Sequence, residues 1–297
     1  MRTTMTHEQQ AAPASYTPVV LRPLRAVGKW FTIGSFLESI GFALAFCWNV
    51  FAAIPVTLKH YRRQTMSTIT DMTWGRGSLI VGGGTAPVML IMGAAIGASI
   101  GIEAYTALEL VSLGPVSGVI SAFANTRELA PIAAGVAFAA QAGCRMTAEI
   151  GSMRISEEID AIEALGVRAV GFVVTTRVIA GVVSMIPTYV IALVVGYLST
   201  RMVVTTVHGE PAGVYDHYFT QFVLGWDIVA SIIKILVFTI AIILIHCYQG
   251  FFASGGPEGV GIASGRAIRA SLVGIIALDM VMTLVLWGLQ SPIRFSG

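Results

Sequence analysis

The sequence predicts an all-α membrane protein with about five transmembrane helices, an N-terminal interfacial helix and a short cytoplasmic helix. Three observations support this fold class. Hydrophobic residues make up 55% of the 297 residues and charged residues only 11%, whereas about 25% of an average soluble domain is charged. The mean hydropathy is +0.79, so too little polar surface is available to cover a soluble globule. Long charge-free stretches recur along the chain, which argues against a soluble enzyme. The 32 glycines and 11 prolines show no strict period, which argues against a disordered chain and a collagen-like chain.

Charge-free windows predict where the membrane-spanning helices lie, since a hydrocarbon core needs about 20 residues of helix. Three windows lack Asp, Glu, Lys and Arg altogether: residues 79–101, 178–200 and 235–257. Two further spans are expected over residues 118–150 and 270–289, although both contain charged side chains. These side chains are Arg127, Glu128 and Arg145 in the first window and Asp279 in the second. Five spans are therefore predicted.

The N-terminal part is expected to differ from the rest of the chain. Residues 1–35 form a polar segment. Residues 36–54 are apolar but contain the charged Glu38. We interpret them as an interfacial or partly inserted helix, with a sixth full span as the alternative. Residues 36–297 then form one membrane domain.

Basic residues gather between the predicted spans and predict the orientation of the chain. They precede the first charge-free window, and they lie between the second and third spans and between the fourth and fifth. Examples are Arg62, Arg63, Arg154, Arg168, Arg266 and Arg269. The positive-inside rule places these residues on the cytoplasmic side. The N-terminus is then cytoplasmic, the C-terminus is external, and residues 203–226 form the one sizeable external loop.

Four charged side chains are predicted to lie at or near membrane depth: Arg127, Glu128, Lys234 and Asp279. A charge in the bilayer centre is costly, so such residues face protein or water and usually pair. One interpretation is a polar patch in a substrate cavity or gate. The other is a buried ion-pair network that fixes helix register. Arg127 and Lys234 could also lie near helix ends, with their charged groups reaching the membrane surface.

Gly93, Gly97 and Gly101 are spaced four residues apart in the first span. This spacing lines one helix face with hydrogen atoms and lets another helix approach closely. The partner is expected to be a helix of the same chain, with a subunit interface as the alternative.

Residues 149–166 predict a short amphipathic helix on the cytoplasmic side. Ser156 is the expected N-cap, Glu157 and Glu158 complement the helix dipole, and Gly166 ends the helix. Apolar side chains recur at helical spacing, at Ile155, Ile159 and Ile162. The acidic side chains of Asp160 and Glu163 face a different side of the helix. A free helix of this length is marginal in water, and its acidic face argues against anionic lipid as the partner. Docking to another protein is therefore predicted.

Other features narrow the range of functions. The net charge of +2 predicts no general attraction for nucleic acid. The three cysteines are widely separated and show no CxxC spacing, so neither a zinc site nor a disulfide framework is indicated. Residues 255–261 are glycine-rich and are expected to form a tight turn between spans. Residues 215–218 offer too few metal ligands and are expected to form an external turn or helix start. The sequence has no P-loop signature, so uphill transport needs another chain or an ion gradient.

Several motifs together resemble the core signature of the MlaE/YrbE permease family. They are Glu128-Leu-Ala-Pro131, Gly143-Cys-Arg-Met-Thr-Ala-Glu-Ile-Gly-Ser-Met153, Ser156-Glu-Glu-Ile-Asp160, Arg177-Val-Ile-Ala180 and Pro257-Glu-Gly-Val-Gly261. The resemblance extends from about Thr85 to the C-terminus, and a signature of this length is more specific than a short motif. Finer details are most similar to the B-type YrbE subunits of actinobacterial Mce lipid-transport systems. These details are His60-Tyr-Arg-Arg63, Tyr215-Asp-His-Tyr218 and His246-Cys-Tyr248.

This resemblance implies a non-catalytic permease subunit of an ATP-driven lipid transporter in the bacterial inner membrane. It implies a second, A-type permease, an ATPase dimer that holds ATP and Mg, and MCE-domain proteins on the external side. The cargo would be a fatty acid, sterol, mycolate or phospholipid, with import as the expected direction. The family's coupling helix corresponds to Ser156, Glu157, Glu158, Ile159, Asp160, Ile162, Glu163 and Leu165. Its polar cavity residues correspond to Arg127, Glu128, Lys234 and Asp279.

Three other functions stay open on the residues alone. A proton-coupled carrier would relay protons through Asp279, Glu128 and Lys234, although no inverted repeat is evident. An intramembrane enzyme would need a nucleophile and a base at the same depth, and Ser99 has no identifiable histidine partner. A structural anchor would tolerate neutralisation of the intramembrane charges.

Overall fold

The structure is a computed structural model that describes residues 41–75 and 84–288. The described residues are almost entirely helical and contain no strand. Contacts divide the chain into two units, Met1–Phe46 and Cys47–Gly297, and the fold below is that of the second. Its α-helices are α2 (Ile54–His60), α3 (Arg62–Trp74), α4 (Thr85–Glu109), α5 (Ser117–Ile120), α6 (Ala130–Phe138), α7 (Cys144–Ile155), α8 (Glu158–Ala164), α9 (Thr176–Thr206), α10 (Ala212–Phe222), α11 (Gly225–Phe251) and α12 (Gly256–Trp287).

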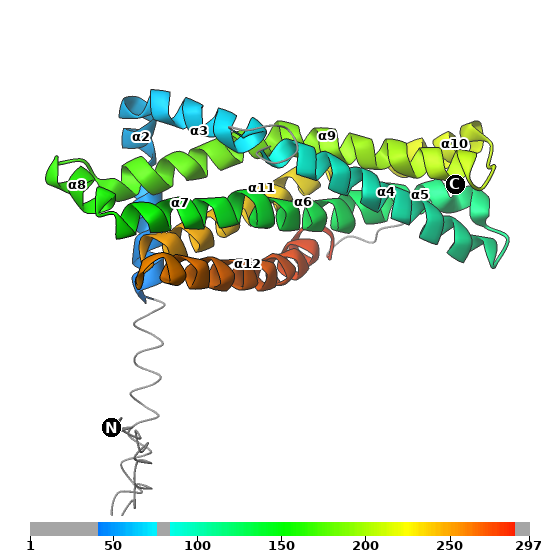
Figure 1. The fold of residues 1–297 in the computed structure, drawn as a ribbon. Helices are drawn as coiled ribbons and strands as arrows, with labels where there is room; N and C mark the ends of the chain where they lie inside the picture. The colour runs from blue at the N-terminus through cyan, green and yellow to red at the C-terminus, as the bar shows by residue number, and fades with distance from the viewer. Residues whose placement is uncertain (1–40, 76–83, 289–297) are drawn as a thin grey trace, which may run out of the picture. The chain divides into compact units, whose positions relative to one another are not determined.

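Five helical stretches are long and apolar enough to cross a membrane, which confirms the predicted fold class. They are Thr85–Glu109, Gly114–Ile155, Val170–Thr206, Gly225–Phe251 and Gly256–Trp287. Figure 1 shows α4, α9, α11 and α12 running side by side with the α6–α7 stretch. The short helix α8 projects at one end of this bundle, and α5 and α10 lie at the other.

The N-terminal apolar segment forms a helix over Gly41–Ala52 that meets α2 at a bend of 40°. Together the two pieces are long and apolar enough for a sixth span, so both alternatives for this segment remain consistent with the helix. The start of the predicted segment, residues 36–40, and the polar residues 1–35 lie outside the described residues.

The charge-free window over residues 235–257 does not coincide with one helix. The fourth span begins at Gly225, ten residues before the window starts, and the fifth span begins at Gly256, before the window ends. The window missed the start of the span because Lys234 is neutralised inside the protein and does not end the helix. The expected turn over residues 255–261 was also too long, since Gly255 turns at φ +91° and the following residues form the first turns of α12.

Wide π-helical turns interrupt the second span and begin the third. They cover Ser121–Leu129, Ala139–Gly143 and Val170–Thr175. Such turns occur mostly as short insertions in α-helices, frequently at functional sites. The first of them contains Arg127 and Glu128, and the third leads directly into Arg177 of α9.

Helices α4 and α9 pack through the glycine stripe. A Cβ atom added at Gly97 would overlap the backbone carbonyl of Gly196, and one at Gly93 would press on the carbonyl of Ala192. Thr200 Oγ1 donates a hydrogen bond of 2.7 Å to the carbonyl oxygen of Gly97. The structure therefore places Gly93, Gly97 and also Gly101 against a helix of the same chain.

Candidate functional site

The intramembrane charges form one cluster around the side chain of Lys234, which is completely buried. Its ammonium group donates to the backbone oxygen of Arg127 at 2.8 Å, Glu128 Oε2 at 2.9 Å and Thr283 Oγ1 at 2.8 Å. It also forms an ion pair of 2.7 Å with Asp279 Oδ1. Thr283 in turn donates to Glu128 Oε1 at 2.9 Å. One lysine thus joins the π-helical turn of the second span to α11 and α12.

A second ion pair lies beside the first and involves a residue outside the predicted set. Arg127 donates to Asp227 Oδ2 from Nε at 3.1 Å and from a terminal nitrogen at 2.8 Å. Trp287 Nε1 donates to the other oxygen of Asp227 at 2.8 Å. The guanidinium also lies over the ring of Phe123 at 4.4 Å, a favourable cation–π position. Asp227 is 1% exposed, so it is a buried member of the cluster.

The structure brings together all four predicted residues, Arg127, Glu128, Lys234 and Asp279, and adds Asp227, Thr283 and Trp287. The additional residues had a sequence signal. Asp227 lies seven residues before Lys234 on α11, and Asp279, Thr283 and Trp287 follow each other at intervals of four on α12. Both spacings place side chains on one helix face. The idea that Lys234 lies near a helix end was wrong, because Lys234 is buried in the body of α11.

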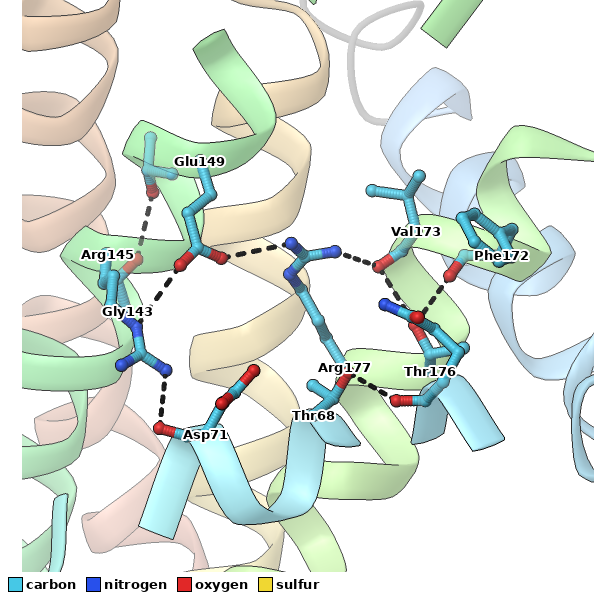
Figure 2. A network of polar contacts seen from close by, with 11 residues as sticks. Thr68, Asp71, Gly143, Arg145, Glu149, Phe172, Val173, Thr176 and Arg177 are labelled. Atoms are coloured by element: carbon cyan, nitrogen blue, oxygen red, sulfur yellow. Dashed lines mark hydrogen bonds and ion pairs between the residues drawn. The ribbon is translucent and has the colours of Figure 1, made fainter. Parts of the chain in front are cut away.

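A second polar network involves the first half of α7 and is shown in Figure 2. Glu149 accepts from Arg177 at 3.1 Å and pairs with Arg145 at 3.5 Å. Arg177 also donates to the backbone oxygen of Val173 at 2.7 Å, and Arg145 donates to the backbone oxygen of Asp71 at 3.0 Å. The network therefore ties α7, which leads into α8, to α9 and α3.

The start of α8 differs from the prediction. Ser156 does not cap α8; it ends α7, and its hydroxyl donates to the carbonyl oxygen of Ser152 at 3.0 Å. The residue that precedes α8 is Glu157, in the left-handed conformation at φ +59°. This sharp turn lets α8 leave the axis of α7 within two residues, Ser156 and Glu157. Gly166 ends the helix at φ +78°, as predicted.

The apolar face of α8 is divided between the protein's own core and the surface. Ile159 is 1% exposed, while Leu165 is 83% exposed. Ile162 is half-buried, and the acidic side chains Glu157, Glu158, Asp160 and Glu163 are exposed. Asp160 is held by Arg154 at 2.6 Å. Ile159 therefore anchors α8 to its own chain, and the exposed surface of α8 is acidic with Leu165 at its end.

The segment between the third and fourth spans contains α10, so residues 215–218 lie inside a helix and not in a turn. Arg201 of α9 donates to both carboxylate oxygens of Asp216, at 2.7 and 2.8 Å. These hydrogen bonds lower the pKa of Asp216. Burial raises the pKa of the neighbouring Tyr215 to about 12, so this phenol stays protonated at neutral pH. One ion pair thus fastens α10 to the end of α9.

The contribution of this pair to the stability of α10 is expected to depend on pH. The pKa of Asp216 is lowered on folding. The stabilisation by the ion pair is therefore complete at pH values above the pKa of an unfolded aspartate, about 4, and is lost as the pH falls through the lower pKa of the folded state. Amide hydrogen exchange of α10, corrected for intrinsic rates, should accelerate over that interval. Asp216→Asn should abolish this dependence, whereas Glu103→Gln, at an exposed carboxylate of α4, should preserve it. An unchanged profile in Asp216→Asn would contradict the assignment.

The five apolar spans and the buried charge cluster define a multi-pass helical membrane protein. Comparison with known proteins then places it in a family. The family model described as "Permease MlaE" matches residues 75–285, so the chain belongs to the MlaE permease family.

The chain is also similar in sequence to individual named proteins. The chain is similar to the chloroplastic protein TRIGALACTOSYLDIACYLGLYCEROL 1 of Arabidopsis thaliana, with 30% identity over 66% of this chain and 56% of that protein. It is 29% identical to the intermembrane phospholipid transport system permease protein MlaE of Haemophilus influenzae, over 68% of this chain and 77% of that protein. A probable ABC transporter permease protein of Rickettsia bellii is 28% identical over 69% of this chain and 79% of its own length.

Proposed function

We propose that this chain is the membrane-spanning permease subunit of an ATP-driven lipid transporter. Membership of the MlaE family supports this proposal, as does the similarity to a phospholipid transport permease and to probable ABC transporter permeases. The chain itself is non-catalytic, and ATP and Mg bind to a separate ATPase dimer. The cargo is a hydrophobic lipid, which the cluster around Lys234 meets at membrane depth.

The proposed assembly follows the B-type YrbE subunits of Mce systems. A second, A-type permease completes the membrane part, and MCE-domain proteins extend the path on the external side of a bacterial inner membrane. The N-terminus is cytoplasmic, the C-terminus is external, and lipid is imported. The basic residues near α8 support this orientation, because the positive-inside rule favours them on the cytoplasmic side.

The observation that supports ATPase coupling best is the position and surface of α8. The helix projects at one end of the bundle, and its exposed side is acidic with a single large apolar side chain, Leu165. The Glu149 network connects α7 to α9 and α3, so a displacement of α8 would be passed to three other helices. Only a partner that binds two conformations of α8 differently can drive such a displacement.

Leu165→Glu is expected to uncouple the ATPase from this chain. The substitution places a charge in the apolar part of the proposed contact, where an unpaired charge is costly. ATP-dependent lipid transfer in the reconstituted complex should fall at least about tenfold, equivalent to ~1.4 kcal/mol of lost contact. Leu165 is 83% exposed, so the chain itself should fold normally.

The matched control is Leu110→Glu, because Leu110 is 85% exposed at the end of α4, away from α8. It should leave ATP-dependent transfer near the wild-type rate. Full coupling in Leu165→Glu would contradict the role of α8. Transfer that continues without the ATPase and stops with an uncoupler would instead favour the proton-coupled carrier.

A further inference from the structure

The charges of the cluster do not balance. The cluster contains the carboxylates of Glu128, Asp227 and Asp279 but only two cations, Arg127 and Lys234. The remaining contributors, Thr283 and Trp287, are neutral hydrogen-bond donors. With all carboxylates ionised, one negative charge remains at membrane depth. An uncompensated charge there is costly, and such residues face protein, water or a polar ligand.

The excess charge is accessible at one place. The side chain of Glu128 is 36% exposed, whereas those of Asp279 and Asp227 are 13% and 2% exposed. Glu128 accepts one hydrogen bond from Lys234 and one from Thr283. A carboxylate offers about four acceptor positions, so its exposed edge keeps acceptor capacity for a further donor.

The two cations are poorly placed to meet a ligand. Lys234 is completely buried, and its ammonium group already contacts four oxygens. The guanidinium of Arg127 is 13% exposed, is bound to Asp227 by two nitrogens and has one face covered by Phe123. A bare anion that approached the cluster would therefore meet a carboxylate first.

We infer that Glu128 is a specificity-determining residue that selects lipids whose head group carries an ammonium over lipids with a net negative head group. This inference rests on the proposed function. An ammonium beside Glu128 would donate a charge-assisted hydrogen bond and balance the cluster, whereas an anionic head group would be repelled.

The inference is tested by equilibrium binding to the purified complex in a neutral maltoside detergent, without ATP. The probes are tail-labelled fluorescent lipids with identical glycerol-linked acyl chains: phosphatidylethanolamine, phosphatidylglycerol, and N-acetylated phosphatidylethanolamine, whose small N-acyl group removes the ammonium without adding a further chain. Wild type should bind phosphatidylethanolamine about tenfold more tightly than the other two. Since the N-acetylated probe is compared on the unmodified protein, this result does not depend on the folding of any variant.

The variants then assign the preference to one side chain. Glu128→Gln keeps an oxygen that can accept from Lys234 and should bring the three probes within about twofold of each other. Glu128→Asp keeps the charge and should retain a preference. Glu103→Gln, which also removes one carboxylate but lies exposed on α4, should behave as wild type. Melting temperatures of all variants show that the proteins compared are folded.

Each remaining outcome overturns the inference. Equal binding of the three probes to wild type would mean that the excess charge is balanced within the complex, by a proton or by a neighbouring subunit. A preference that persists in Glu128→Gln would assign it to another residue. Tight binding without preference leaves the proposed function in place, whereas binding of no probe contradicts the proposed function as well.

Discussion

Lys234→Met is expected to destabilise the folded protein by about 3–5 kcal/mol, because it leaves buried carboxylates without their counter-charge. Lys234 is 0% exposed and pairs with the carboxylates of both Glu128 and Asp279. Without it, the cluster would hold three carboxylates and one cation. Chemical unfolding of the purified chain in detergent micelles, followed by tryptophan fluorescence, measures the change.

Two comparisons distinguish lost charge balance from lost side-chain volume. Lys59→Met changes an exposed lysine of α2 and should alter the unfolding free energy by less than about 0.5 kcal/mol. Adding Glu128→Gln and Asp279→Asn to Lys234→Met leaves one cation and one carboxylate and should restore a large part of the stability. If the triple variant is less stable than the single one, the cluster is held together by packing rather than by charge.

Gly97→Ile is expected to prevent close packing of α4 on α9 and to destabilise the protein by roughly 3 kcal/mol or more. A Cβ atom at Gly97 overlaps the carbonyl of Gly196, which is rigid backbone and cannot move aside as a side-chain tip could. Separating the helices would also break the hydrogen bond from Thr200 to Gly97. The yield of monodisperse protein and its melting temperature measure the effect.

Gly261→Ala is the matched control, because a Cβ atom at this helical glycine of α12 meets nothing within 4 Å. It should be neutral or stabilise by up to about 1 kcal/mol, since alanine is the better helix former. Wild-type stability of Gly97→Ile would contradict the packing described for α4 and α9.

The fold could be predicted from the sequence because the membrane imposes a simple rule on it. Spans must be apolar over about 20 residues. Windows without charge located three of the five spans, and the other two were apolar enough to be recognised despite the charged residues in them. The errors arose where tertiary structure overrides this rule. The fourth charge-free window began only after Lys234, but this lysine lies within α11, where the carboxylates of Glu128 and Asp279 pair with it. Ser156 was a reasonable N-cap by residue type, yet the left-handed Glu157 begins α8 instead.

The four central charges of the candidate site could also be predicted, since a charge within an apolar helix stands out. Asp227 could not be found in this way, because it lies near the start of its span and resembles a loop residue. Thr283 and Trp287 are common in membrane helices and gain meaning only from their partners, Glu128 and Asp227. The division of α8 into a buried Ile159 and an exposed Leu165 likewise depends on how α8 packs, which helical periodicity does not determine.

The wide helical turn over Ser121–Leu129 also sets how the second span is rotated about its own axis. In an α-helix each residue turns the chain by about 100°, and a π-helical turn inserts one extra residue. Deleting one residue of this turn would restore a regular α-helix and rotate the preceding part of the second span by about 100° about the helix axis. Ser117–Ile120, which packs on α10, would then turn away from that helix. The hydrogen bond from Lys234 to the backbone oxygen of Arg127 would meanwhile hold the rest of the span in place. The length of this segment is therefore as constrained as the identity of its charged residues.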